Sequence, residues 1–392
     1  MMPQGLSSPD LRKRNRAGIL RLMHRHGSIA RNDLALELGL TRASVTYLIN
    51  ELLADGLVEE GLATGADGRV GRRKILMHIR AHAASVVGIG ADSERLQVVL
   101  ADLSGAVLGV RNLPSPAAPD SDAGSIESNL VLQITRALAE LTAEAPGHPV
   151  LGAGIVVTGR VDSESGISLR EPRLWQGQVN LRDPLERALG VPVAVDNNVR
   201  ALALAELLLT DAKASSSSDL LFVKYGPGVG AAWVVGGVPW TGAHFRSGEL
   251  GHTLVENDGP VCAYCGRRGC LESLVSARAL ADTLGLQKGR AEDLCSMLES
   301  HDQPALATLA TRFARAIGNA IEVCDPSVVT LYGAPFNSGR LFDEIARRIE
   351  SNERPCGIRR SGLNPDLPAL GGAALALDKF FLGQGTWQGL RA

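Results

Sequence analysis

The first part of the chain reads as a series of amphipathic helices. Apolar residues recur every three or four positions over 11–26 and again over 31–38, the spacing that buries one face of a helix. Gly39 allows a tight turn, and Thr41 is a good N-cap for a third helix. The apolar stripe of that helix consists of Val45, Leu48, Ile49, Leu52 and Leu53. Two helices joined by a short glycine turn are typical of a helix-turn-helix.

A β-hairpin is expected to follow these helices. A strand begins at 56–60, and 75–79 return beyond a loop, 65–74, that is rich in glycine and arginine. Such a hairpin is the wing of a winged helix, and its arginines suit phosphates or a minor groove. We therefore predict a DNA-binding domain over 1–80. The residues expected to contact double-stranded DNA are Arg42, Ser44, Thr46, Tyr47 and Asn50 of the third helix and Arg69, Arg72 and Arg73 of the wing.

Charge is divided unevenly along the chain. Residues 1–80 carry thirteen lysines and arginines against eight aspartates and glutamates, although the whole chain has a net charge of −2. The remainder is therefore acidic, and only the N-terminal part is expected to meet a polyanion. The alternative is a three-helix protein-interaction module with a solvated basic face, which the basic wing disfavours.

Beyond about residue 84, strands alternate with helices. Strands at 85–89, 96–103 and 107–110 precede a helix near 126–143 and a buried strand at 150–157. A similar order begins again later, so the pattern predicts a duplicated ribonuclease-H-like α/β unit, the actin-like sugar-kinase fold. The further helices and strands are expected at 181–189, 191–195, 199–209, 220–224, 231–235, 276–284, 304–323, 328–331 and 340–350.

Length and composition agree with this organisation. A chain of 392 residues is too long for one ordinary domain, and 45% hydrophobic with 21% charged residues is typical of a soluble globular protein. We expect the α/β part to form one effector-binding domain, 81–392. Its small lobe is predicted at about 84–197 together with a C-terminal helix, and its large lobe, with the metal site described next, at about 198–371.

Residue types that bind metals gather in the second half of the chain. One histidine and three cysteines fall within nineteen positions, and thiolates with an imidazole suit a tetrahedral zinc ion. The predicted ligands of this structural Zn2+ are His252, Cys262, Cys265 and Cys270. Glu249 and Glu272 bracket the cluster but are poor structural ligands beside thiolates, so we expect them to face a small-molecule pocket. The alternative is a set of cysteines without metal.

The other cysteines and the N-terminus indicate a compartment. Cys295, Cys324 and Cys356 stand among apolar neighbours and are predicted to be buried thiols. The sequence shows no signal peptide and no apolar run of membrane-spanning length. We expect a cytoplasmic protein, because in a reducing compartment such clusters bind metal more often than they form disulfides.

Several short motifs together resemble the ROK family, which comprises repressors, open reading frames and kinases. They are Gly248-Glu-Leu-Gly-His252, Gly269-Cys-Leu-Glu272, Val195-Asp-Asn-Asn198 and Ala205-Glu206. The likeness extends over essentially the whole chain, and the winged helix ahead of these motifs resembles the repressor branch. One departure is that two residues separate Cys262 from Cys265, where the family usually has one. This spacing is also common in zinc knuckles.

The resemblance implies a set of sugar contacts. In the kinases of the family, the residues that match Glu249, His252 and Glu272 contact the sugar. His252 would then serve both sites, with one ring nitrogen on the metal and the other on the ligand. Asn197 and Asn198 are the remaining residues that the resemblance places at the sugar.

The same resemblance argues against catalysis. Asn198 stands where the kinases have the aspartate that acts as base, and an amide cannot accept a hydroxyl proton at neutral pH. Asp196 is close but lies two positions earlier. The first phosphate loop is replaced by 90–94, and the second, 226–230, has a proline where threonine is usual. We therefore expect a protein that is not an enzyme.

These features predict a transcriptional regulator, most simply a repressor of sugar-related genes. A sugar or sugar derivative is its expected effector, and a homodimer or tetramer its expected assembly. The alternatives are a sugar kinase with an added DNA-binding domain and a ligand-independent regulator with a vestigial pocket. Arg173 and Trp175 follow a strand near the expected sugar. They are predicted either to add specificity or to pack on the lobe surface.

Overall fold

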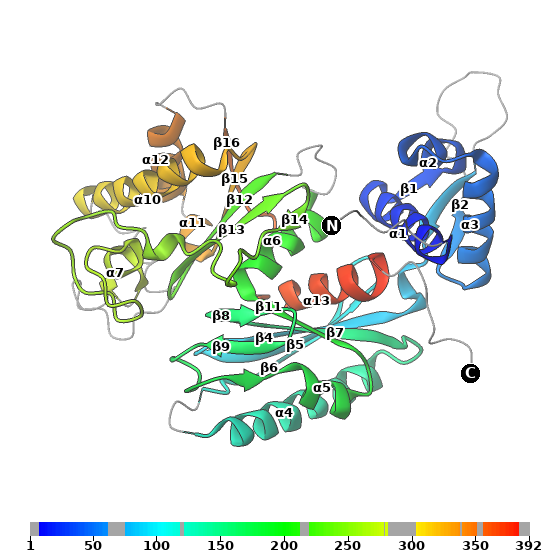
Figure 1. The fold of residues 1–392 in the computed structure, drawn as a ribbon, viewed down its shortest axis with the longest axis horizontal. Coiled ribbons are helices and arrows are strands. Elements are labelled where there is room, and N and C mark those ends of the chain that lie inside the picture. The colour runs from blue at the N-terminus through cyan, green and yellow to red at the C-terminus, as the bar shows by residue number, and fades with distance from the viewer. Residues whose placement is uncertain are drawn as a thin grey trace. The chain divides into compact units, whose positions relative to one another are not determined.

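The computed structural model folds into two compact units (Figure 1). The first consists of 1–201, 207–214 and 368–392, and the second of 202–206 and 215–367. The residues that the structure describes are 8–61, 75–117, 121–211, 219–277, 279–280, 303–337, 339–350 and 356–383. Arg69, Arg72 and Arg73 of the predicted wing tip, Cys295, and most of the predicted helix 276–284 lie outside these residues.

The N-terminal head is a winged helix with one strand more than predicted. Its helices are α1 (Ser8–His26), α2 (Arg31–Leu38) and α3 (Arg42–Ala54), and its strands are β1 (Ser28–Ala30), β2 (Val58–Gly61) and β3 (Leu76–Ile79), in the order β1-β3-β2. Thr41 caps α3 as expected, because its Oγ1 accepts from the Ser44 amide at 3.1 Å. Gly39 ends α2 at a φ of 64°, which favours glycine. Strand β1 was missed because three residues are too few for a periodic pattern.

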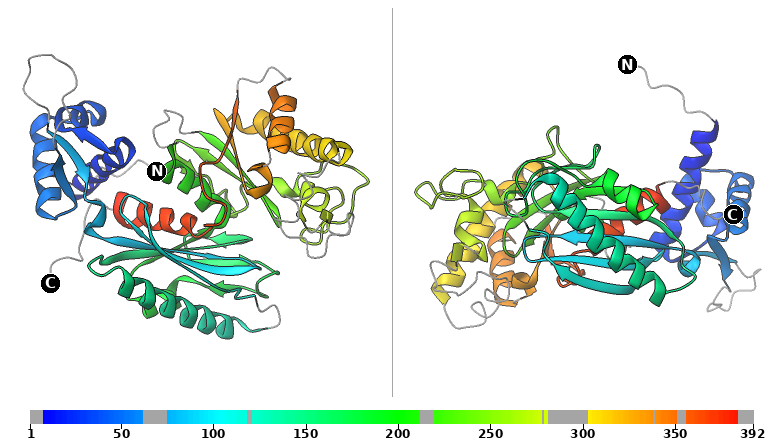
Figure 2. Two further views of the ribbon diagram at one scale, coloured as in Figure 1. Left: turned by 180° about the vertical axis from the view of Figure 1, so that it is seen from behind. Right: turned by 90° about the horizontal axis from the view of Figure 1, so that it is seen from below.

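The head shares a core with the rest of the first unit. Ile19 and Met23 of α1 are fully buried in the same cluster as Leu377 and Phe381. These two belong to a π-helical segment, η4 (Leu377–Leu382). Helix α1 and this C-terminal segment lie next to each other (Figure 2). The head is therefore packed on the first lobe by apolar side chains.

The first lobe is built on a five-stranded sheet. The sheet contains β4 (Ser85–Ala91), β5 (Arg95–Asp102), β6 (Val107–Pro114), β7 (Val150–Val157) and β11 (Val193–Asn197), in the order β11-β7-β4-β5-β6. A short 3-10 turn, η1 (Ala81–Ala83), precedes it, and a small sheet contains β8 (Arg160–Asp162), β9 (Ile167–Arg170) and β10 (Val179–Asn180). Helices α4 (Ala123–Glu144) and α5 (Arg182–Leu189) cover one face of the large sheet, and α13 (Leu370–Ala376) covers the other (Figure 1).

Glycines allow α13 to approach this sheet closely. A Cβ at Gly88 would lie 2.3 Å from the Ala369 carbonyl oxygen, and one at Gly154 would lie 2.1 Å from that of Gly372. Real Cβ atoms do not come so near to backbone oxygens, so only glycine fits at either position.

The second unit repeats the same sheet. Its strands are β12 (Leu220–Tyr225), β13 (Val229–Val235), β14 (Val238–Pro239), β15 (Val328–Tyr332) and β16 (Gly357–Arg360), in the order β14-β13-β12-β15-β16. In both sheets the first strand is central, with an antiparallel hairpin on one side and two parallel strands on the other. The predicted duplication is therefore confirmed.

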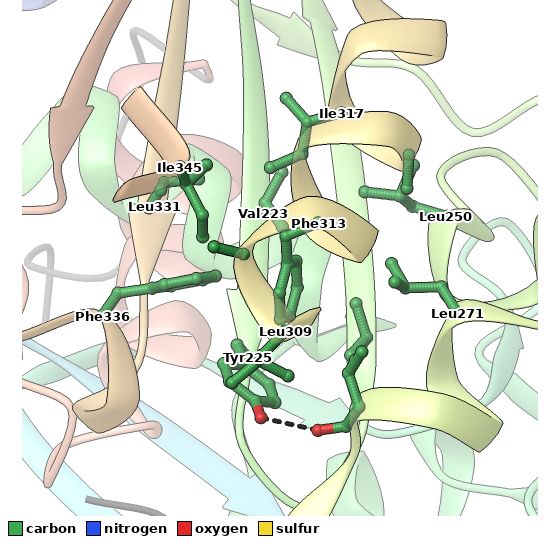
Figure 3. Close-up of a cluster of buried hydrophobic side chains, with 14 of the residues drawn as sticks. Val223, Tyr225, Leu250, Leu271, Leu309, Phe313, Ile317, Leu331, Phe336 and Ile345 are labelled. Atoms are coloured by element: carbon green, nitrogen blue, oxygen red, sulfur yellow. Dashed lines mark hydrogen bonds between the residues drawn. The ribbon is translucent and has the colours of Figure 1, made fainter. Parts of the chain in front are cut away.

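Helices pack an aromatic core against this second sheet. They are α10 (Gln303–Cys324), α11 (Ala334–Asn337), α12 (Gly339–Glu350) and α7 (Leu271–Val275). Helix α6 (Asn198–Leu209) connects β11 to β12 along the chain. Tyr225 is buried against Phe313 and Phe336, and its hydroxyl donates to the Val275 carbonyl at 2.5 Å (Figure 3). A buried phenol needs such a partner. In the described ranges, no helix combines the length and apolar character that a membrane crossing requires.

Two of the three scattered cysteines can be located. Cys356 is buried as predicted, whereas Cys324 is only half-buried because it ends α10. Burial raises the pKa of both thiols. The prediction of a buried thiol is therefore wrong for Cys324.

Candidate metal centre and ligand site

The four predicted metal ligands come together in the second unit. Their ligand atoms all lie within 4.8 Å of one another. His252 Nδ1 lies 3.6 Å from Cys262 Sγ, and Cys265 Sγ lies 3.4 Å from Cys270 Sγ. A tetrahedral zinc ion with ordinary bond lengths would hold a nitrogen and a sulfur about 3.6 Å apart and two sulfurs about 3.8 Å apart. The sulfurs are too far apart for a disulfide, so the side chains fit a zinc ion.

Tight backbone contacts place the histidine motif on strand β13. Gly248 has a φ of 82°, and a Cβ there would lie 2.0 Å from the Ala231 carbonyl oxygen. A Cβ at Gly251 would lie 2.2 Å from the Val229 carbonyl oxygen. Because both glycines lack a side chain, a single 3-10 turn, η3 (Leu250–His252), can lie flat on the strand and bury His252.

The loop 253–270, called the knuckle loop below, then brings the three cysteines to that histidine. Isolated bridges pair Leu254 with Cys270 and Val261 with Arg268. Arg267 donates from Nη2 to the His252 carbonyl oxygen at 2.7 Å. Backbone pairing and the Arg267 side chain therefore fix the loop to the histidine turn.

The three thiols of the cluster ionise unequally. Burial raises the pKa of Cys262 and raises that of Cys270 to about 12. Burial acts on Cys265 too, but hydrogen bonds from the Arg267 amide and from neighbouring side chains lower its pKa to about 7. A metal ion binds thiolates, so uptake by this cluster would release protons.

Glu249 and Glu272 lie beside this cluster on different elements, Glu249 at the start of η3 and Glu272 in α7. His252 Nε2 lies 3.6 Å from Glu249 Oε2, on the side of the ring away from the thiols. The Glu249 side chain remains one-third exposed (33%), so solvent or a ligand can reach it. Glu272, in the first turn of α7, accepts the Val229 amide at 3.0 Å through Oε2. The two ring nitrogens of His252 therefore face different groups, Nδ1 the Cys262 thiol and Nε2 the Glu249 carboxylate.

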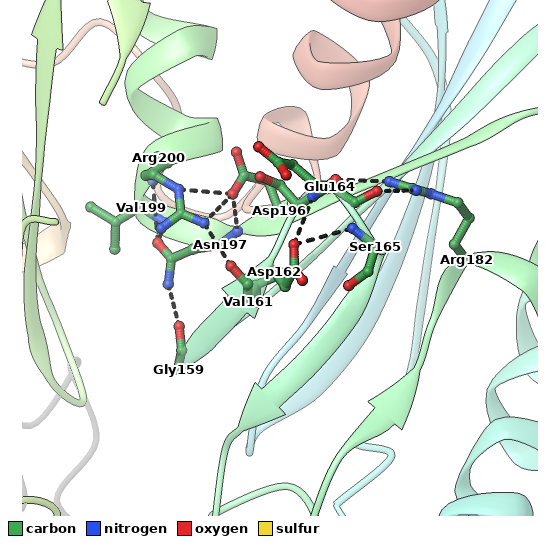
Figure 4. A network of polar contacts seen from close by, with 11 residues as sticks. Gly159, Val161, Asp162, Glu164, Ser165, Arg182, Asp196, Asn197, Val199 and Arg200 are labelled. Atoms are coloured by element: carbon green, nitrogen blue, oxygen red, sulfur yellow. Dashed lines mark hydrogen bonds and ion pairs between the residues drawn. The ribbon is translucent and has the colours of Figure 1, made fainter. Parts of the chain in front are cut away.

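Asn197 and Asn198 belong to the first unit and begin helix α6. Asn197 is its N-cap, where Oδ1 accepts the Val199 amide at 2.8 Å and Nδ2 donates to the Gly159 carbonyl at 2.8 Å (Figure 4). Both ends of this amide are therefore engaged in structure. Asn198 is half-buried as the first helical residue.

The carboxylate of Asp196, next to these asparagines, is paired with Arg200, which was not among the predicted site residues. Asp196 Oδ1 accepts from Arg200 Nε at 2.8 Å, and Arg200 also donates to the Val161 carbonyl (Figure 4). Both residues are buried, Arg200 almost completely (2% exposed) and Asp196 with 9% of its surface exposed. The Oδ1 atom of this carboxylate is therefore already engaged within the chain. The i, i+4 spacing of the two residues was the available signal.

Both loops that the resemblance compares with phosphate loops contain internal turn hydrogen bonds. Asp92 Oδ1 accepts the amides of Glu94 and Arg95, which closes the turn between β4 and β5. Gly226 donates to the Gly228 carbonyl at 3.0 Å in the hairpin between β12 and β13. The amides of Glu94 and Arg95 are thus already satisfied within the chain.

Trp175 does not lie where a sugar could meet it. It is 0% exposed in the core of the first lobe, and Nε1 donates to Ser168 Oγ at 3.2 Å. Arg173 forms an ion pair with the buried Glu171 at 3.0 Å. Both expectations for Trp175, sugar specificity and surface packing, are wrong, because an indole of this size gains most by full burial with its N–H paired.

Helix α3 of the head presents the predicted DNA-facing residues. Arg42, Ser44, Tyr47 and Asn50 are exposed, while Thr46 is half-buried. The stripe that faces the core is Val45, Leu48, Ile49 and Leu52. An exposed polar face on a firmly buried helix is the arrangement that enters a major groove.

A carboxylate on the same helix organises the neighbouring side chains. Glu51 accepts from Arg12 Nε and Arg16 Nη1, both at 3.2 Å, and Arg12 lies over the Tyr47 ring. Partial burial would raise the pKa of Glu51, but hydrogen bonds from Tyr47, Arg16 and Arg12 outweigh it, so the pKa lies below its ordinary value of 4.5.

Fold and site together define a class: a winged helix fused to a duplicated α/β sugar-kinase fold with a Cys3His cluster. A model of the ROK family matches residues 86–379, and a model of the MarR family matches residues 12–70. The chain belongs to the ROK family.

Relatives match over most of the chain. A putative xylose repressor from Caldicellulosiruptor sp. (strain Rt8B.4) is 28% identical and covers 86% of each chain. The regulator NagC of Escherichia coli (strain K12) is 28% identical over 71% of this chain and 68% of its own. A crystal structure of a ROK family transcriptional regulator, a homologue of the E. coli MLC protein, has a TM-score of 0.81 and covers 96% of this chain and 98% of its own at 24% identity, which shows the shared fold.

Proposed function

We propose that this protein is a DNA-binding transcriptional regulator, a repressor of sugar-related genes whose operator binding is controlled by a sugar or sugar derivative. The observation that carries the proposal is the exposed polar face of α3 on a head packed against a ROK body. Similarity over 86% of this chain to a putative xylose repressor, and over 71% to the DNA-binding regulator NagC, supports it.

The proposed operator contacts are of two kinds. Arg42, Ser44, Thr46, Tyr47 and Asn50 of α3 would read base edges or neighbouring phosphates in the major groove. The wing arginines Arg69, Arg72 and Arg73 would hold phosphates or enter a minor groove.

The proposed effector site lies beside the metal cluster. The hydroxyl groups of a sugar both donate and accept hydrogen bonds, which suits the carboxylates Glu249 and Glu272 and the N–H of His252. A Zn2+ ion on His252, Cys262, Cys265 and Cys270 would stabilise the fold of this region and carry no chemistry. Asn197 and Asn198 remain predicted sugar contacts. Because the side chain of Asn197 is already hydrogen-bonded within the chain, Asn198 is the better candidate for such a contact.

Regulation without catalysis is the second part of the proposal. Asn198 cannot act as a base, and Asp196 is held by Arg200. We also propose a homodimer, because two-fold operators match two heads, and a cytoplasmic location, because reduced thiols favour metal binding.

A titration of genomic DNA fragments with the full-length protein at moderate salt tests the DNA-binding proposal. We expect selective shifts, and at least a tenfold loss of affinity, about 1.4 kcal/mol, for Arg42→Ala. Arg136→Ala removes the same charge from the exposed face of α4 and is the matched control. A protein that shifts no fragment selectively would disprove the proposal.

A sugar kinase with an added DNA-binding domain is the rival function, favoured by the retained Glu249 and His252. Purified protein with ATP and a panel of hexoses, pentoses and amino sugars distinguishes the two. We expect no sugar-dependent ATP turnover. Turnover that Asn198→Ala or Glu249→Ala abolishes would establish the kinase.

A further inference from the structure

The imidazole of His252 is held on three sides. Its Nδ1 faces the thiols and its Nε2 faces Glu249, as described above. The third contact is with Tyr264, whose ring is stacked on the imidazole with 4.9 Å between centroids and only 4° between planes. Parallel rings in van der Waals contact are about 3.5 Å apart, so this distance describes an offset stack, a favoured arrangement for aromatic pairs.

Tyr264 lies in the knuckle loop, which carries the three cysteines of the cluster. It is the second of the two residues between Cys262 and Cys265, and it is half-buried. Farther along the same loop, Arg267 holds the His252 carbonyl at 2.7 Å. The knuckle therefore contacts the backbone of the histidine through Arg267 and the flat face of its ring through Tyr264.

The direction of His252 Nε2 matters for a ligand. With Nδ1 on a metal, Nε2 carries the ring proton. Its 3.6 Å separation from Glu249 Oε2 is too long for a direct hydrogen bond. A hydroxyl oxygen about 2.8 Å from both atoms would accept from His252 and donate to Glu249, which only a group with both capacities can do.

We propose that Tyr264 is a positioning residue that fixes the plane of the His252 imidazole and so aims Nε2–H at a ligand hydroxyl shared with Glu249. This inference rests on the effector site proposed above. A bond to metal at Nδ1 leaves the ring free to tilt about that bond. The stack removes this freedom before the ligand arrives, which lowers the cost of ordering the site.

Three single variants of the full chain test the assignment. Tyr264→Ala removes the stacked ring, Tyr264→Phe keeps it without the hydroxyl, and Val261→Ala shortens an exposed side chain of the same knuckle as a control. Zinc per chain shows whether the cluster is intact. The exchange rate of the His252 Nε2 proton with water, from 15N-histidine-labelled protein, reports the ring itself. Calorimetry with D-xylose and N-acetyl-D-glucosamine reports the effector site.

Tyr264→Ala is expected to keep one zinc per chain, speed Nε2 proton exchange at least tenfold and weaken sugar binding about three- to tenfold. Tyr264→Phe and Val261→Ala are expected to match the wild type in all three measurements. Exchange and affinity within twofold of the wild type in Tyr264→Ala would overturn the assignment, as would loss of its zinc. If the wild type binds neither sugar, the effector proposal loses its support, while the exchange rates still decide the assignment of Tyr264.

Discussion

Single residues decide what the motifs of this chain can do. Asp196 keeps a negative charge beside the asparagines of α6, but Arg200 holds it in a buried ion pair. Cys265 differs from its two partner thiols because the Arg267 amide donates to it. In each case the identity of one neighbour determines the chemistry of the group.

Removing one cysteine of the cluster is expected to release the metal. Cys270→Ala should reduce zinc from about one per chain to near zero and lower the melting temperature by several degrees, because binding energy of the ion is also folding energy. Cys324→Ala, at the end of α10, is the control and should keep the metal. Colorimetric zinc assay and calorimetry provide the two measurements, and equal zinc in both variants would contradict the site.

Glu51 is expected to make the head sensitive to acid. Its pKa is lowered in the folded chain, so its stabilising contribution is present above its ordinary value of 4.5 and is lost as pH falls through the lower folded value. Glu51→Gln should therefore cost stability at pH 7, and the difference from the wild type should shrink between pH 5 and the folded pKa.

Melting curves of the wild type and Glu51→Gln across this pH range provide the measurement. A few degrees of difference at neutral pH is the expected size. Glu164→Gln, at an exposed position of the first lobe, should show no such pH-dependent difference. A constant difference between wild type and Glu51→Gln at every pH would contradict the prediction.

At the scale of elements, the C-terminal segment joins the head to the first lobe. Helix α13 lies on the sheet through Gly88 and Gly154, and η4 continues from it into the cluster around α1. The ion pair Arg21–Asp378 and the hydrogen bond from His24 Nε2 to the Leu208 carbonyl add polar contacts, at 2.7 Å and 2.9 Å. A displacement of α6 or α13 would therefore reach α1 directly.

Leu377→Ala is expected to weaken this junction. The side chain is fully buried, so its truncation should cost about 2–5 kcal/mol of unfolding free energy. Lys379→Ala, two residues away and exposed, should stay within about 0.5 kcal/mol of the wild type. Urea unfolding of the full chain measures both, and equal effects would show that the segment does not hold the head.

On the scale of the whole molecule, a basic head and an acidic body share one chain. The proposed operator and effector sites are coupled only if the sugar distinguishes two states of the protein. Such coupling is reciprocal by thermodynamic necessity.

An effector sugar is expected to weaken operator binding about 5- to 150-fold, and the operator should weaken sugar binding by the same factor. Fluorescence anisotropy with labelled operator and calorimetry with the sugar measure the two factors. Arg42→Ala, which reduces DNA affinity, should leave the affinity for sugar in the absence of DNA unchanged. A sugar that binds without changing operator affinity would contradict the proposed regulation.

Much of the fold could be predicted because its signals are local. The helices α2 and α10, strand β7 and the cap at Thr41 follow from periodicity and short-range hydrogen bonding, and the predicted bounds match within a residue. The four cluster residues could be found from spacing alone. The short strands β1, β8, β10, β14 and β16 could not, because two to four residues carry no period.

The sequence by itself determined the winged helix, the repeated α/β pattern and which histidine and cysteines could form a cluster, since residue type and spacing specify them. Only the tertiary structure decided that Trp175 lies in the core and that Tyr264 stacks on His252. These contacts depend on how turns and strands approach one another in space. Such approaches are set by packing of the whole chain, and packing leaves little trace in any short stretch of sequence.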